Sequence, residues 1–336
     1  MVTKKGKVVI GLMMIAGLMM GWVSISNGQD KPITLKLGSI DAVANPANVA
    51  TLKFAELVSQ KTNGKVKIEV YPASQLGTAI SQIESIMTGS LDMGQFAVGF
   101  FGQYIKDWNV LALAFAFKNQ DHLRTFLESN TNTQIKEQFL KQYKVRVLVE
   151  NWLRPPNVIA TTKPVRKLDD LKGLKMRVPE IEMYLQNWKQ LGTSPTVVAW
   201  GETYMGLRQG VVEGVDLPFD FIKGMKFHEV APNITMTNHL LTHALIIMSE
   251  DVYQKLSADV KKALTDAGKE AGDFYVQLGR KAVETDREEL SNKLNAKIYE
   301  VDSTPFRERM APLAKELEGK NYWKAGLYDA IQAIGK

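Results

Sequence analysis

Alternating hydrophobic and polar positions open the chain and predict strands and helices in turn. Residues 33–38 and 65–71 alternate with a period of two, which is typical of strands with one buried face. Between them, Asn45-Pro46 has the form of a helix start, because proline fits the first helical turn. The residues that we expect on the buried face of this helix are Val49, Leu52, Ala55 and Val58.

The same alternation continues and predicts two α/β domains. A helix over 78–87 and a strand over 91–96 complete a β-α-β-α-β order, which favours a largely parallel sheet. A second run of this kind follows. Its predicted strands are 144–150, 158–162, 175–178, 195–198 and 211–217, and its predicted helices are 181–191 and 202–208.

The last third of the chain is predicted to be mostly helical. Strand patterns over 234–238 and 241–249 precede it, and a strand over 297–301 and two helices close the chain. Apolar residues spaced by three or four predict one long helix of at least six turns, which could cross between domains. These residues are Val260, Leu264, Ala267, Ala271, Phe274, Leu278 and Ala282.

The N-terminus has the pattern of a secretory signal peptide, predicted over residues 1–26. Lys4, Lys5 and Lys7 precede an uncharged stretch over 8–23, small residues follow, and no acidic residue occurs before Asp30. An uncleaved N-terminal anchor is the alternative. Removal of residues 1–26 leaves 39 basic and 36 acidic residues, a formal charge of +3 against +6 for the whole chain. This small excess argues against a nucleic-acid partner.

Composition excludes several kinds of chemistry. The 336 residues include no cysteine, which excludes disulfide scaffolds, thiolate metal sites and cysteine nucleophiles. Nucleotide-binding glycine loops, a serine-hydrolase elbow and the zinc-protease motif are also absent from the sequence. His239 and His243 are four residues apart in a predicted strand, which is not a metal site by itself. An aromatic series that could line a groove or pack in the core comprises Phe96, Phe100, Phe101, Tyr104 and Trp108.

Taken alone, the residues favour a secreted two-domain α/β binding protein. A secreted hydrolase or lyase on the same scaffold is the alternative, although no nucleophile or acid/base pair stands out in the sequence. A cleft with a base beside a nucleophile would indicate the enzyme, whereas a cleft with arginine and aromatic residues would indicate a binding protein.

Several ordered motifs make the chain resemble a known family. The most specific is the run Leu171-Lys-Gly-Leu-Lys-Met-Arg-Val-Pro179. With the other motifs, the chain from about residue 33 onward resembles the solute-binding proteins of TRAP transporters, of the C4-dicarboxylate-binding type. The motifs that carry the resemblance are 54–58, 62–64, 72–77, 89–93, 170–180, 210–214, 226–230 and 237–239.

The resemblance implies a two-domain periplasmic binding protein fold with a hinged interdomain cleft and a long domain-spanning helix. Domain I would comprise 31–154 and 243–282, and domain II 155–242 and 283–336. The function implied is periplasmic capture of a small organic carboxylate for delivery to TRAP membrane permease subunits, by a monomer without a cofactor. A ligand sensor that serves a membrane receptor is a further alternative.

In this family the arginine of the Arg-Val-Pro motif holds the solute carboxylate, which is Arg177 here. A guanidinium suits that role because it forms two parallel hydrogen bonds with a carboxylate. Arg177 also lies at the end of a predicted strand, where α/β proteins often bind ligands. The candidate neighbours that would contact the rest of the solute are Arg154, Asn157, Trp200, Asp216, Gln95 and Phe96.

This chain departs from the family pattern at several places, one of which is Ala79-Ile80, where relatives commonly have a Glu-Arg pair. The second arginine of many relatives aligns with Pro156 or Asn157, and Arg154 is the nearest substitute. Relatives that bind sugar acids often have Gln-Glu-Asn-Pro where this chain has Val215-Asp-Leu-Pro218. The loss of that asparagine argues against the sugar-acid pattern and favours an apolar or aromatic monocarboxylate.

Overall fold

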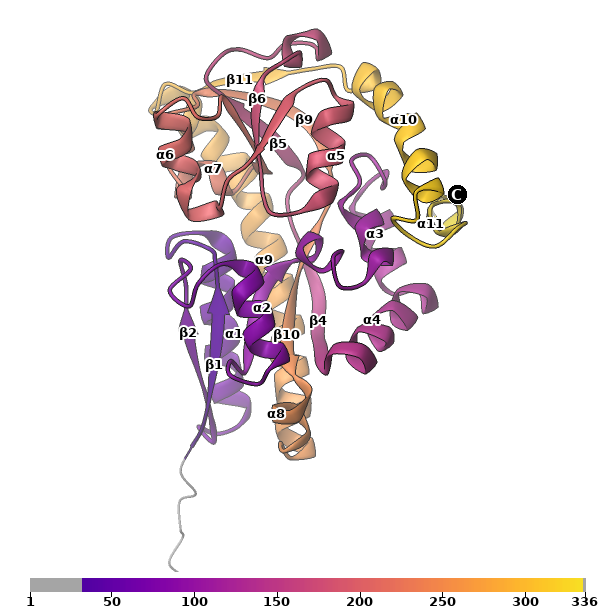
Figure 1. The fold of residues 1–336 in the computed structure, drawn as a ribbon. Helices are drawn as coiled ribbons and strands as arrows, with labels where there is room; N and C mark the ends of the chain where they lie inside the picture. The colour runs from indigo at the N-terminus through magenta and orange to yellow at the C-terminus, as the bar shows by residue number, and fades with distance from the viewer. Residues whose placement is uncertain (1–31, 335–336) are drawn as a thin grey trace, which may run out of the picture. The chain divides into compact units, whose positions relative to one another are not determined.

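Two mixed β-sheets organise residues 32–334, the part of the chain that this computed structural model describes (Figure 1). The first sheet has the strand order β2-β1-β3-β10-β4, and the second has the order β11-β9-β5-β8-β6-β7. The strands are β1 (Ile33–Ser39), β2 (Val66–Tyr71), β3 (Met93–Ala97), β4 (Val145–Leu153), β5 (Asn157–Thr161), β6 (Lys175–Val178), β7 (Ser194–Val197), β8 (Gly214–Pro218), β9 (Asn233–Leu240), β10 (His243–Ser249) and β11 (Lys297–Glu300).

Helices cover both sheets, and short 3₁₀ turns occur in the connections. The helices predicted over 78–87, 181–191 and 202–208 are present within one residue of their predicted ends. The α-helices are α1 (Pro46–Lys61), α2 (Ala79–Met87), α3 (Gln120–Leu127), α4 (Asn130–Tyr143), α5 (Glu182–Gln190), α6 (Thr203–Arg208), α7 (Phe221–Gly224), α8 (Glu250–Gln254), α9 (Ala258–Asn292), α10 (Thr304–Gly319) and α11 (Leu327–Ile334).

The first sheet is mixed, so the prediction of a largely parallel sheet was only partly correct. β1 pairs in parallel with β2 and β3, as the β-α-β-α-β order requires. β10 is antiparallel to both β3 and β4. The physical reason is that β10 enters this sheet directly from the end of β9 in the other sheet. It therefore runs in the direction opposite to β3 and β4.

The predicted buried face of α1 was wrong at Val49 and Leu52, whereas Val58 is buried as predicted. The side chains of Val49 and Leu52 are 39% and 50% exposed. The side chains of Phe54 and Leu57 are buried instead. The buried face also contains Thr51, whose hydroxyl donates to the carbonyl oxygen of Ala47 at 2.9 Å. The helix backbone accepts the hydrogen bond of the Thr51 hydroxyl, so this polar side chain can be buried. The buried face of α1 therefore differs from the face with the most hydrophobic residues.

The chain passes between the two sheets three times. β4 continues through Arg154-Pro155-Pro156 into β5, and β9 continues through Leu241-Thr242 into β10. The third passage is α9, which packs along α1 and β4 and reaches β11 near its end (Figure 1). Gly268 permits this close packing, since a Cβ there would lie 2.9 Å from both methyl groups of Val149. The long helix predicted from periodicity is therefore confirmed.

The two C-terminal helices pack against helices that lie on different sheets. α10 packs against α5, whereas α11 packs against α3. His122 of α3 has its Nε2 atom 2.8 Å from the carbonyl oxygen of Ile331 in α11. The division at residues 154, 242 and 282 stays a prediction, and the predicted signal peptide over 1–26 lies outside the described residues. Within residues 32–334, no helix is both long and apolar enough to cross a membrane.

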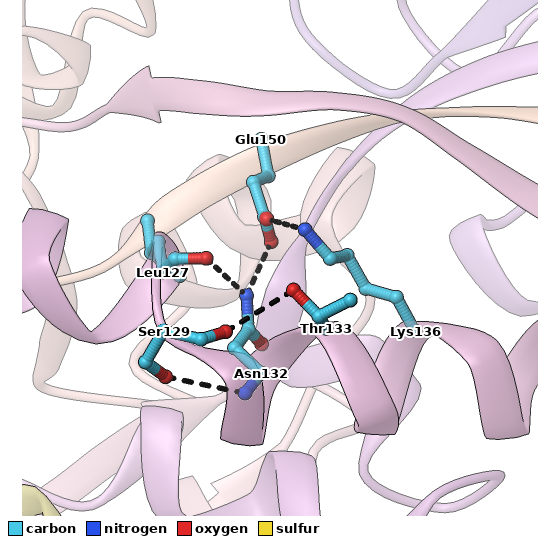
Figure 2. A network of polar contacts seen from close by, with 6 residues as sticks. All are labelled: Leu127, Ser129, Asn132, Thr133, Lys136 and Glu150. Atoms are coloured by element: carbon cyan, nitrogen blue, oxygen red, sulfur yellow. Dashed lines mark hydrogen bonds and ion pairs between the residues drawn. The ribbon is translucent and has the colours of Figure 1, made fainter.

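A polar network holds α4 against the edge strand β4 (Figure 2). Glu150 of β4 forms an ion pair with Lys136 of α4. The Asn132 amide donates to Glu150 at 3.0 Å and to the carbonyl oxygen of Leu127 at 2.9 Å. Burial raises the pKa of Glu150, although Lys136 opposes this rise. The network therefore fixes the start of α4 to the outermost strand of the first sheet.

Candidate ligand-binding site

A narrow cavity of about 60 Å³ lies where the strand ends of the two sheets meet. The structure brings all seven residues singled out from the sequence together around this one cavity. They are Gln95, Phe96, Arg154, Asn157, Arg177, Trp200 and Asp216. They come from β3 of the first sheet, from β5, β6 and β8 of the second sheet, and from the segments that follow β4 and β7.

Arg177 occupies the carboxyl-terminal half of β6 and is only 3% exposed. Its Nε donates to the carbonyl oxygen of Val198 at 2.9 Å, and its guanidinium lies 5.3 Å from the ring centre of Trp200. Within residues 32–334, no acidic side chain comes within ion-pair distance of it. Burial lowers its pKa to about 10, and Asp216 and Tyr184 oppose this effect. Arg177 is therefore charged at neutral pH and lacks a carboxylate partner.

Arg154 is also buried, but two acidic residues lie near it. Its Nη2 atom lies 4.0 Å from Oδ2 of Asp41, and its guanidinium packs 5.1 Å from the ring centre of Phe221. Asp220 lies in the same buried cluster and accepts a hydrogen bond of 3.2 Å from the Tyr275 hydroxyl of α9. Burial raises the pKa of Asp41 and raises that of Asp220 to about 7, and Arg154 opposes both rises.

Asp216 is the polar centre of the β8 side of the cavity, and it is 4% exposed. Its Oδ1 accepts a hydrogen bond of 2.6 Å from the Asn157 amide, and its Oδ2 accepts one of 2.9 Å from the Trp188 indole. The same Oδ2 lies 3.2 Å from Nε2 of His239. Because three neighbours hold this carboxylate in place, Asp216 fixes the orientation of Asn157 at the cavity.

Aromatic side chains form much of the remaining wall. Phe96, Phe100, Tyr184, Trp200 and Phe221 all line the cavity. Trp200 is held edge-on by Phe221 at 5.7 Å and by Phe227 at 5.6 Å between ring centres.

The aromatic series from the sequence therefore divides between the cavity and the core. Phe96 and Phe100 line the cavity, whereas Phe101 and Trp108 are fully buried against Phe139. Tyr104 packs against Tyr143 at 5.4 Å between ring centres.

Several buried polar atoms of the lining residues lack a hydrogen-bond partner in the described part of the chain. The donors are Nε2 of Gln95, Nε1 of Trp200 and Nε of Arg154. The acceptors are Oδ1 of Asn157 and Oδ2 of Asp41. Buried polar groups are rarely left unpaired in proteins, so this arrangement is suited to a ligand that carries both acceptors and donors.

The lining is suited to holding a ligand rather than to cleaving one. Among the described residues that line the cavity, none is a serine, threonine, cysteine, lysine or histidine. Within residues 32–334, no group of three or more potential metal ligands is present either. His239 and His243 belong to different strands, β9 and β10, so they do not form a helical pair.

Sequence reasoning missed the acidic residues beside Arg154. Asp41 follows β1 and Asp220 follows β8, both at carboxyl ends of strands that point toward the cavity. The rule that ligands bind at such ends, applied to every predicted strand, could have indicated both residues. It could not have indicated Tyr275, because that hydroxyl lies in the middle of α9.

Comparisons with known proteins agree with this architecture. The family model described as "Bacterial extracellular solute-binding protein, family 7" matches residues 37–321. The chain is 31% identical over 288 residues to the sialic acid-binding periplasmic protein SiaP of Vibrio cholerae, with 85% of this chain and 88% of that protein covered.

Solved structures of sugar-acid-binding proteins are also similar. One is the sugar acid binding protein of Advenella mimigardefordensis in complex with galactonate, with a TM-score of 0.84, 27% identity, and 90% of this chain and 99% of that chain covered. Another is a TRAP periplasmic solute binding protein of Ochrobacterium anthropi with bound L-fuconate, with a TM-score of 0.83, 28% identity, and 90% and 99% covered.

Proposed function

The chain belongs to family 7 of the bacterial extracellular solute-binding proteins, which serve TRAP transporters, and we propose that it captures a small organic carboxylate in the cavity around Arg177. The candidate neighbours of the solute are Gln95, Phe96, Arg154, Asn157, Trp200 and Asp216. The structurally similar proteins hold galactonate and L-fuconate, which are themselves organic carboxylates.

The observation that carries this proposal is the unpaired charge of Arg177. A buried cation without a counter-ion is costly, because burial removes the water that would stabilise it. A ligand carboxylate would restore that stabilisation through two parallel hydrogen bonds. Nε of Arg177 already donates to Val198, and this contact would fix the orientation of the guanidinium plane toward the cavity.

The proposed partners are the membrane permease subunits of a TRAP transporter. A cleavable signal peptide over residues 1–26 would direct the protein to the periplasm. We propose that the mature protein is a monomer, since one chain supplies every residue of the cavity.

Mass spectrometry of the small molecules released from the protein tests the proposed function. The protein is purified from the periplasm of its native host without dialysis and then denatured. We expect an organic acid in near-stoichiometric amount from the wild-type protein and far less from Arg177→Ala. Release of a neutral solute or a metal complex, with no carboxylate, would overturn the proposal.

A further inference from the structure

We propose that the cavity accepts an acid with a single carboxylate, and that Asp41 and Asp220 exclude a second carboxylate by neutralising Arg154. This inference rests on the proposed capture of an organic carboxylate and adds which acids are selected. Two arginines line the cavity, so the competing hypothesis is a dicarboxylate with one carboxylate for each arginine.

The two arginines differ in what surrounds them. No acidic side chain of residues 32–334 pairs with Arg177, which leaves it free for a ligand carboxylate. Arg154 has Oδ2 of Asp41 at 4.0 Å, and Asp220 lies in the same buried cluster. These acidic groups come from the ends of β1 and β8, so each sheet supplies one carboxylate toward Arg154.

The charges around the cavity therefore favour an anion at Arg177 over an anion at Arg154. Asp41 and Asp220 act on Arg154, whereas the nearest acidic influence on Arg177 is Asp216, which already accepts hydrogen bonds from Asn157 and Trp188. A first ligand carboxylate meets the unpaired Arg177. A second one would meet an arginine that is already compensated and would lie beside Asp41 or Asp216, where water cannot screen the repulsion.

The rest of the cavity offers neutral polar groups for the remainder of the ligand. Nε2 of Gln95 is an unpaired donor and Oδ1 of Asn157 is an unpaired acceptor. A hydroxyl group can donate to one and accept from the other, whereas a carboxylate can only accept. The asparagine oxygen would therefore face a second carboxylate without a hydrogen bond, which adds to the discrimination.

The number of carboxylates on the natural ligand is the first test. The mass-spectrometric experiment described above identifies the released acid, and we expect it to carry one carboxylate. An acid with two carboxylates overturns this inference and leaves the proposed function standing. Release of a molecule without a carboxylate overturns the proposed function itself, so the two failures are distinguishable.

Calorimetry with matched acids is the second test. The probes are galactonate and galactarate, erythronate and meso-tartrate, and 4-hydroxybutyrate and succinate. The members of each pair differ only by a hydroxymethyl group in place of a second carboxylate. For the pairs that bind, we expect the wild-type protein to favour the monocarboxylate at least tenfold. Failure of all six acids to bind, or equal or tighter binding of a dicarboxylate, overturns the inference.

Variants of the two acidic residues test their role in this selection. Asp41→Asn and Asp220→Asn each keep the side-chain shape, and the calorimetry is done at pH 8, above the raised pKa of Asp220 of about 7, so that each substitution removes one negative charge near Arg154. We expect each variant to reduce the preference for the monocarboxylate at least fivefold, mainly through tighter dicarboxylate binding. The control is Asp169→Asn, which removes an exposed carboxylate outside the cavity and leaves the preference unchanged. An unchanged preference in both site variants, each with wild-type-like unfolding, overturns the role of the pair.

Discussion

At the scale of single residues, the cavity is defined by buried charges with unequal compensation. Arg177 is charged and unpaired, Arg154 is surrounded by Asp41 and Asp220, and Asp216 is held by three neighbours. An uncompensated charge destabilises the empty protein and stabilises the complex with an oppositely charged ligand. The feature that makes Arg177 a poor structural residue is therefore the one that suits it to the proposed role of binding a carboxylate.

Asp220 predicts a specific dependence of stability on pH. Burial raises its pKa from 3.8 to about 7, so between about pH 4 and 7 the folded protein keeps a proton that the unfolded chain releases. Stability is therefore lost as the pH rises through this range, by on the order of 4 kcal/mol. In Asp220→Asn this loss should be absent. Urea unfolding of both proteins at pH 4.5, 6 and 8 measures the difference.

The comparison of pH profiles has a simple control. Asp169 is exposed, so Asp169→Asn should lose stability with rising pH in parallel with the wild-type protein. If Asp220→Asn also runs parallel to the wild-type protein, then Asp220 is ionised in the folded state at low pH and does not carry a raised pKa.

The seven residues that line the cavity together could be predicted, but the compensation of their charges could not. Arg177 was indicated by the Arg-Val-Pro motif and by its place at a strand end. Arg154 was only a substitute for an arginine that the family pattern places elsewhere, and the structure shows that it lines the cavity. Its pairing with Asp41 depends on how two sheets approach each other, and no local pattern in the sequence encodes that distance.

At the scale of elements, periodicity located the long helix α9 and missed the shorter helices α3 and α4. α9 was predicted from seven spaced apolar residues, and it spans Ala258–Asn292. α4 was not predicted, because it buries few apolar side chains and starts with a run of polar residues. α3 was not predicted either, although Leu123, Phe126 and Leu127 form its buried face, because it spans only Gln120–Leu127. Asn119 and Ser129, whose side chains cap these helices, were signals that could have located them.

Asn132 should contribute more to stability than its polar character suggests. Its amide is buried and donates both to Leu127 and to Glu150 (Figure 2). Asn132→Ala removes both bonds and leaves a buried carbonyl oxygen without its donor. We expect the free energy of unfolding to fall by about 1–3 kcal/mol, measured by urea denaturation.

The matched control for this substitution is Asn130→Ala on the same helix. Asn130 is exposed, and a surface substitution of this kind changes stability by about 0.5 kcal/mol or less. Equal effects of the two substitutions would contradict the view that the network in Figure 2 anchors α4 to β4.

At the scale of the whole molecule, the location of the cavity implies that the protein must open to load its ligand. The cavity is narrow, and its lining comes from both sheets, which three passages of the chain connect. We expect the sheets to separate without ligand and to close around it by a hinge motion. Small-angle scattering should then show a smaller radius of gyration in the presence of the bound acid.

The scattering experiment needs a variant that cannot be closed by ligand. Arg177→Ala at the same acid concentration should keep the larger radius of gyration of the empty protein. An identical radius for the wild-type protein with and without saturating ligand would contradict closure by a hinge motion.

Calorimetry on Arg177→Ala tests most directly whether Arg177 anchors a carboxylate, with the acid identified by mass spectrometry as the titrant. Removing one partner of a buried charge pair costs about 3–5 kcal/mol, so affinity should fall by roughly a hundredfold or more. Arg177→Lys should recover only part of the lost affinity, because an ammonium group cannot form two parallel hydrogen bonds. Arg208→Ala, at an exposed position outside the cavity, should bind like the wild-type protein.

The melting temperature without ligand completes this measurement. Because Arg177 is buried and unpaired, Arg177→Ala should melt no lower than the wild-type protein and should lose only the rise that the ligand causes. The predicted result is a stable protein that no longer binds the acid. Binding by Arg177→Ala within about threefold of the wild-type affinity, a difference under ~1 kcal/mol, would show that Arg177 is not the anchor and would transfer that role to Arg154.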